Sequence, residues 1–133
     1  MNKAIAKYQQ LNVASVVDSA SPHELVEMLF DGAAARLQKA SGCISHDDIN
    51  GRNEAINQTI SILHGLQASL DRKEGGDLAE NLDALYAYMQ RQLIRANSDN
   101  DQRVLAEVQD LLKTLQQAWR AISEPAELAS SHA

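Results

Sequence analysis

The chain has 133 residues, of which 44% are hydrophobic and only 4% aromatic, and its 12 basic and 18 acidic side chains give a net charge of −6. This length suits one domain with its own core, and the negative charge disfavours binding to nucleic acid or anionic lipid. The single cysteine, Cys43, excludes an internal disulfide. No apolar run approaches the roughly 18 residues of a membrane span or forms a signal peptide, so we expect a cytoplasmic protein with no membrane insertion.

Residues 1–20 are small, polar and weakly patterned, which predicts a flexible N-terminal segment. Within it, Ile5 and Tyr8 are apolar residues three positions apart. A helical domain is predicted over 21–124, and residues 125–133 are expected to form a disordered tail.

The first predicted helix covers 22–44 and has a complete start signal. Ser21 can accept a hydrogen bond from an exposed backbone N–H, and Pro22 occupies a position where a missing N–H costs nothing. Glu24 completes a Ser-x-x-Glu capping box, and its charge suits the positive end of the helix. Apolar residues then recur on one helical face: Leu25, Val26, Leu29, Phe30, Ala33, Leu37, Ala40 and Ile44.

Three further helices are predicted over 49–72, 77–96 and 101–122, separated by short links rich in turn-forming residues. Short links between helices of about 20 residues favour antiparallel neighbours. The predicted fold is therefore all-α, an antiparallel up-down-up-down four-helix bundle with a flexible N-terminal segment that caps it.

The apolar faces of these three helices are wider than a surface helix needs. Their central rows are Ile49, Ile56, Ile60, Leu63 and Leu70; Leu78, Leu82, Leu85, Tyr86, Met89, Leu93 and Ala96; and Val104, Val108, Leu111, Leu115, Ala118 and Ile122. Flanking rows add Ile62 and Leu66 in the second helix and Leu105, Leu112 and Trp119 in the fourth. These flanking residues are either ordinary edge positions of a bundle or the lining of a groove for another protein's amphipathic segments.

No arrangement of residues predicts chemistry. No histidine has a glutamate three positions before it, as a di-iron bundle requires, and Glu27 occupies the position where a zinc-protease motif starting at His23 needs its second histidine. We expect His23 to be an exposed first-turn residue. Gly75–Gly76 lacks the lysine of a phosphate loop and is interpreted as a turn. We therefore assign no enzymatic activity, catalytic residue, cofactor, metal site or small-molecule substrate.

Four segments carry a family resemblance: 20–32, 81–89, 96–101 and the pair Ala118–Trp119. In this order and spacing they closely resemble the bacterial flagellar secretion chaperones. The resemblance implies a cytosolic export chaperone that binds the disordered C-terminal region of flagellin, prevents premature polymerisation and delivers it to the flagellar type III export apparatus. It also implies contact with the export gate, and some members of the family bind the flagellar anti-sigma factor.

The resemblance favours the groove interpretation of the flanking rows. The predicted partner contacts are Ile62, Leu66, Tyr88, Leu105, Leu112 and Trp119, and the predicted N-terminal lid consists of Ile5 and Tyr8. Tyr86 and Tyr88 point 200° apart on a helix, so Tyr86 is placed in the core and Tyr88 at the surface. The alternative function is a self-associating helical bundle with a structural or adaptor role and no flagellin client.

Overall fold

A computed structural model describes residues 20–122 of the chain. The predicted lid residues Ile5 and Tyr8 and the predicted tail lie outside this range. Within it are four helices: α3 (Pro22–Ser45), α4 (Ile49–Ala68), α5 (Arg72–Asp99) and α6 (Gln102–Ala121).

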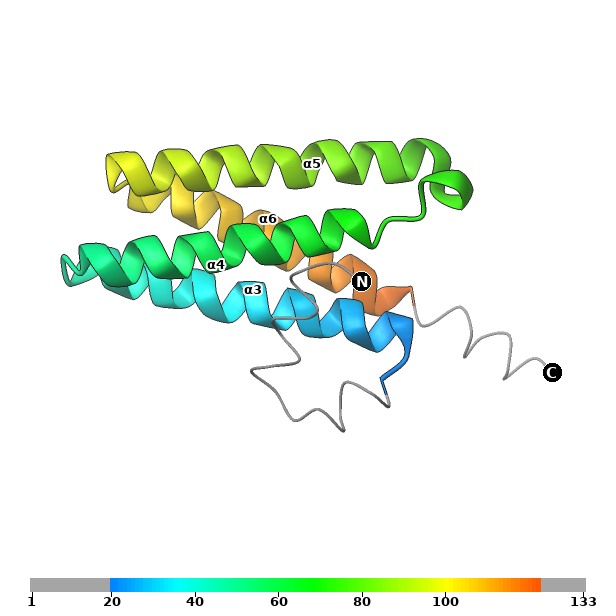
Figure 1. Cartoon of the computed structure of the whole chain (residues 1–133), viewed down its shortest axis with the longest axis horizontal. Coiled ribbons are helices and arrows are strands. Elements are labelled where there is room, and N and C mark those ends of the chain that lie inside the picture. Colours follow the sequence, from blue (N-terminus) through cyan, green and yellow to red (C-terminus); the bar gives the residue numbers. More distant parts are fainter. Residues whose placement is uncertain (1–19, 123–133) are drawn as a thin grey trace.

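The helices alternate in direction and lie side by side along the long axis of the molecule (Figure 1). α3 packs against α4 and α6, and α5 packs against the same two helices from the opposite side. The predicted all-α, up-down-up-down four-helix bundle is confirmed for the described residues.

Each helix begins with a side-chain oxygen that satisfies backbone N–H groups of its first turn. The Ser21 hydroxyl accepts from the Glu24 N–H at 3.1 Å, and the Glu24 carboxylate accepts from the Ser21 N–H at 3.3 Å, which completes the predicted capping box. Asp48, Asp71 and Asp101 cap the other three helices in the same way. These caps explain why the starts of α3, α4 and α6 were readable from the sequence, whereas the Asp71 cap of α5 was not predicted.

The boundaries between α4 and α5 differ from the prediction. α4 ends at Ala68 instead of residue 72, because Asp71 accepts hydrogen bonds from the N–H groups of Lys73 and Glu74 and so starts a new turn. That turn joins the predicted third helix through a kink at Gly76, where φ is 51° and ψ is −128°. This left-handed conformation is open to glycine and strained for other residues.

The core lies along the bundle axis and receives side chains from all four helices. Phe30 of α3, Leu63 of α4, Met89 of α5 and Val108 of α6 are at most 2% exposed. Tyr86 is also buried, as predicted.

The ends of several predicted apolar rows are exposed, in contrast to the prediction. Ile49, Leu78 and Ile122 are 58%, 63% and 51% exposed, and Ala118 is exposed as well. These residues lie near helix ends, where fewer neighbouring turns remain to cover them.

Candidate docking groove at one end of the bundle

Four of the six predicted partner contacts lie in the hydrophobic core. The exposed fractions are 5% for Ile62, 1% for Leu66, 0% for Leu105 and 1% for Leu112. Among the described residues, this burial agrees with the alternative that these side chains are ordinary edge positions of the bundle. Their contact with a partner protein stays a prediction. In α6, Leu105 and Leu112 of the supposed flanking row are buried, as are Val104 and Val108 of the supposed central row. The later members of that central row turn outward and are partly or fully exposed: Leu115, Ala118 and Ile122.

The outward row of α6 forms an apolar groove with α3 and the start of α5. The groove encloses about 120 Å³ of open space. Its lining residues are Phe30, Leu78, Leu82, Tyr86, Leu115, Ala118, Trp119 and Ile122. Trp119 is thus the one predicted partner contact that lines it.

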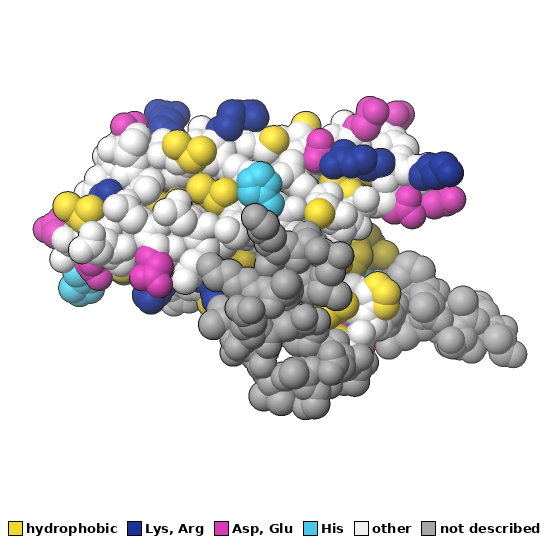
Figure 2. Space-filling view, in the orientation of Figure 1, with side chains coloured by type: hydrophobic (Ala, Val, Ile, Leu, Met, Phe, Trp, Pro, Cys, Tyr) yellow, Lys and Arg dark blue, Asp and Glu magenta, His cyan; other side chains and the backbone are white. Residues whose placement is uncertain are grey.

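The groove occupies the end of the bundle where α3 and α5 begin and α6 finishes. In Figure 2, hydrophobic side chains show beside the end of α6, while charged side chains gather around the link between α4 and α5. That link and the start of α5 contain exposed Asp71, Arg72, Lys73, Glu74 and Asp77. The groove therefore has an apolar interior next to a charged rim.

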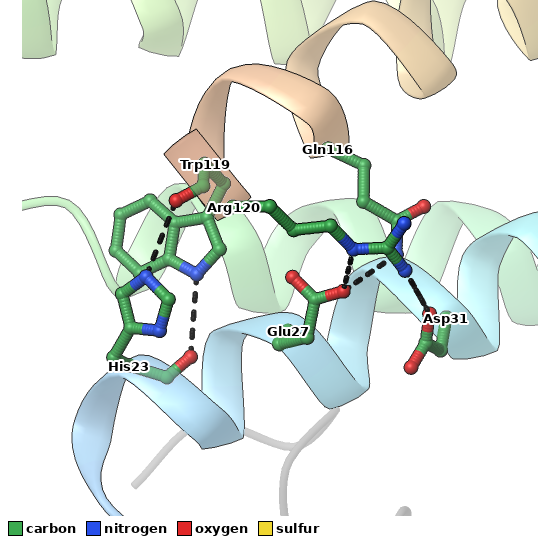
Figure 3. Close-up of polar contacts among 6 residues, drawn as sticks. All are labelled: His23, Glu27, Asp31, Gln116, Trp119 and Arg120. Carbon is green, nitrogen blue, oxygen red and sulfur yellow. Dashed lines mark hydrogen bonds and ion pairs between the residues drawn. The ribbon is translucent and has the colours of Figure 1, made fainter. Parts of the chain in front are cut away.

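Trp119 is held against His23 by three contacts (Figure 3). The two rings are stacked, with centroids 4.5 Å apart and planes 12° apart. The indole Nε1–H donates to the His23 carbonyl at 3.2 Å, and His23 Nε2 lies 3.2 Å from the Trp119 carbonyl oxygen. Since a carbonyl can only accept, the proton of this second bond is on Nε2.

This arrangement corrects the expectation that His23 is an exposed first-turn residue. The side chain is half-buried because the end of α6 lies over the first turn of α3. The sequence contains no local signal for the contact, since the two residues are 96 positions apart.

A polar cluster joins α3 to α6 next to the ring stack (Figure 3). Arg120 Nε lies 2.5 Å from Glu27 Oε1, and Arg120 Nη2 lies 3.3 Å from Asp31 Oδ1. Gln116 Nε2 donates to the same two carboxylates at 3.0 and 2.6 Å. The hydrogen bond to Glu27 raises the pKa of the Arg120 guanidinium, which stays charged. The cluster fixes the register of the two helices.

Tyr88 lies outside the groove, on the α5–α6 side of the bundle. Its hydroxyl lies 3.1 and 3.2 Å from the two carboxylate oxygens of Glu107 and accepts from Gln92 Nε2 at 3.2 Å. The Arg91 guanidinium stands 5.9 Å from the ring centroid. Tyr88 is therefore half-buried in a polar setting formed by its own chain.

A second hollow lies between α3 and α6 and encloses about 200 Å³. Leu37 and buried Leu112 belong to its lining, and the other lining residues are Ala34, Gln38, Gln109, Lys113 and Gln116. Three of its seven lining residues are glutamines and one is a lysine, so it is less apolar than the groove beside Trp119.

Among residues 20–122, no cluster of three or more histidine, cysteine, aspartate or glutamate side chains is arranged to hold a metal ion. Within the same range, no helix is long and apolar enough to cross a membrane.

The fold and the groove define a helical bundle with a preformed apolar groove, the kind of surface to which amphipathic helices dock in other proteins. Comparison with known proteins agrees with this class. The family model for the flagellar protein FliS matches residues 4–126.

Three relatives show the extent of the similarity. The flagellar secretion chaperone FliS of Salmonella typhimurium is 44% identical over 128 residues, which are 96% of this chain and 95% of the relative. FliSB of Pseudomonas aeruginosa is 40% identical over a match that covers 91% of this chain and 96% of the relative. FliS of Escherichia coli is 39% identical over a match that covers 89% of this chain and 88% of the relative. The chain belongs to the FliS family of flagellar secretion chaperones. Membership implies a non-enzymatic role in flagellar export, with a flagellar protein as client.

Proposed function

We propose that the protein binds the disordered C-terminal region of flagellin in the cytoplasm, prevents its premature polymerisation and delivers it to the flagellar type III export apparatus. Family membership supplies the class of client. The observation that carries the proposal is the open groove at the end of the bundle, where Leu78 and Ile122 are 63% and 51% exposed.

The groove has the form that an amphipathic helix requires. Leu78 and Leu82 are four residues apart on α5, and Leu115, Trp119 and Ile122 follow at intervals of four and three on α6. Each spacing places side chains on one helical face. A client helix can lay its apolar face between these two rows, as in other helix-in-groove complexes. Flagellin segments covered in this way are unavailable for filament assembly.

The groove is one part of a longer proposed path. Coupled folding and binding buries on the order of 1,000–3,000 Å², which is more than a groove of this size provides. We keep Ile62, Leu66, Tyr88, Leu105 and Leu112 as proposed further contacts. Contact with the four buried members of this set requires that the side chains now covering them move.

The N-terminal lid also remains a proposal. Ile5 and Tyr8 would cover apolar surface in the free protein and leave it when flagellin binds. Deletion of residues 1–15 should then increase the binding of an apolar dye and change the affinity for flagellin. If neither quantity changes, there is no lid. The export gate and the flagellar anti-sigma factor are proposed as further partners from family resemblance alone.

The main test compares two substitutions on the same helix. Leu78 lines the groove, whereas Ile94 is 60% exposed on α5 but does not line it. Leu78→Ser should weaken binding of a flagellin C-terminal peptide about tenfold in calorimetry, and Ile94→Ser should leave it unchanged. Both should keep the free energy of unfolding within about 0.5 kcal/mol of wild type.

Light scattering during the same titration tests the alternative function. A one-to-one complex is expected for a client chaperone. A concentration-dependent dimer that releases no heat with the peptide would instead establish the self-associating bundle. Equal effects of the two substitutions would show that the client binds elsewhere.

A further inference from the structure

We propose that His23 is a positioning residue of the groove, which holds the Trp119 indole in place as a preformed wall. This inference rests on the proposed function, in which the groove receives the client. It assigns a role to a residue that does not itself line the groove.

The contacts of His23 oppose movement of the indole in three ways. Ring stacking at 4.5 Å opposes displacement of the ring plane, and the bond from Nε1 to the His23 carbonyl opposes rotation within that plane. The bond from His23 Nε2 to the Trp119 carbonyl fixes the backbone from which the indole projects. The accepting carbonyl is itself in the first turn of α3, which the reciprocal Ser21–Glu24 cap holds.

Other contacts keep the two helices together without His23. Glu27 and Asp31 on α3 bind Gln116 and Arg120 on α6. Loss of the His23 side chain should therefore loosen the indole, which keeps only its bond to the backbone carbonyl of residue 23, without separating α3 from α6. This separates a positioning role from a general role in folding.

A fixed wall matters because a mobile tryptophan must be ordered when the client docks. Ordering side chains at an interface opposes binding, and a preformed surface avoids this cost. Trp119 is the largest side chain of the groove, so its release should reduce affinity more than the loss of a small rim residue.

Trp119 is the only tryptophan of the chain, so its fluorescence reports on the wall directly. In the free full-length protein, His23→Ala should lower the fluorescence anisotropy and raise acrylamide quenching about twofold, since the stack and one hydrogen bond are lost. His23→Phe retains an aromatic ring and should restore much of the wild-type signal. Arg120→Ala, the matched control, removes an exposed partner of the polar cluster and should leave the indole fixed.

The same variants are then titrated with the apolar dye ANS and with the flagellin C-terminal peptide. His23→Ala should weaken both about tenfold, and His23→Phe should weaken them less. Circular dichroism and urea unfolding show whether each variant folds. If His23→Ala does not fold, His23→Phe and His23→Gln are compared with wild type instead.

The inference is overturned if the indole is equally restricted in wild type and His23→Ala. It is also overturned if the indole is released but the affinities for dye and peptide stay unchanged. If wild-type protein binds ANS but not the peptide, the proposed function fails, and the fluorescence and dye results still decide the role of His23.

Discussion

Polar side chains join neighbouring helices at both ends of the bundle, but the apolar groove lies at one of them. At the end where α4 begins and α5 finishes, Arg52 donates to Asn97 and Asn100 at 2.6 and 2.7 Å. Gln102 donates to the Ser45 hydroxyl at 3.2 Å, which joins α6 to α3. We call this the closed end, because the groove and the Gly76 kink lie at the other one.

The opposite end, which we call the open end, contains the groove and the Gly76 kink. Trp119 is fixed there by His23, while Leu78 and Ile122 are left exposed. The difference shows that one continuous apolar pattern can serve two purposes. It forms core where helices pack fully and leaves an apolar groove where they do not, which is the surface that the proposed function assigns to the client.

The largest expected effect on the free energy of unfolding distinguishes a core residue from a groove residue. Leu105→Ala, at a fully buried position of α6, should lower the free energy of unfolding by about 2–5 kcal/mol, because it leaves a cavity. Leu78→Ala at the open end should change it by less than about 0.5 kcal/mol. Urea denaturation measures both. Similar values for the two would show that Leu78 is packed as fully as Leu105.

A second prediction concerns Tyr86, a buried residue in the lining of the groove at the open end. Burial raises the pKa of the Tyr86 hydroxyl to about 12, from an ordinary value of 10.0. Below pH 10 the hydroxyl is neutral in both states. As the pH rises from 10 to 12, it ionises first in the unfolded chain, so the folded state loses stability, by about 2–3 kcal/mol at the upper end.

Tyr86→Phe provides the control for this effect. Its free energy of unfolding should resemble that of wild type at pH 7 and should fall less steeply above pH 10. Parallel slopes for the two proteins in alkaline urea titrations would show that Tyr86 ionises as readily in the fold as in the unfolded chain.

The smallest expected effects on the free energy of unfolding come from replacing two glycines, one near each end of the bundle. Gly76→Ala should lower the free energy of unfolding by about 1–3 kcal/mol, because alanine is strained at a φ of 51°. Gly42→Ala, near the end of α3, meets no atom within 4 Å and should raise it by about 0.5–1 kcal/mol. Thermal unfolding checks the opposite signs. A neutral Gly76→Ala would mean that the kink is easily rearranged.

Local signals in the sequence predicted the helices well. The Ser21–Glu24 box, and the aspartates before α4 and α6, act within one turn, so adjacent residues determine them. The end of α5 was predicted too early, because Asn100 adopts a left-handed conformation and closes the helix only after Asp99. The order of elements and the antiparallel bundle followed from these signals and the short links.

The candidate site could be predicted only in part. Trp119 was identified from its size and position, but the row that contains Leu115 and Ile122 was assigned to the core. When the apolar face of a helix is wider than its contact with the neighbouring helices, the sequence does not show which edge of that face the neighbours cover. The pairing of His23 with Trp119 depends on α3 and α6 being neighbours, which is a property of the packed bundle and not of either helix.

The contact between His23 and Trp119 also places the beginning of α3 beside the finish of α6. A short peptide could therefore join residue 122 to residue 20, with new termini cut in the α3–α4 turn at 46–48. Such a circular permutant of the helical domain would retain all four helices and their neighbours. It would also move the chain ends away from the groove, to the opposite pole of the molecule.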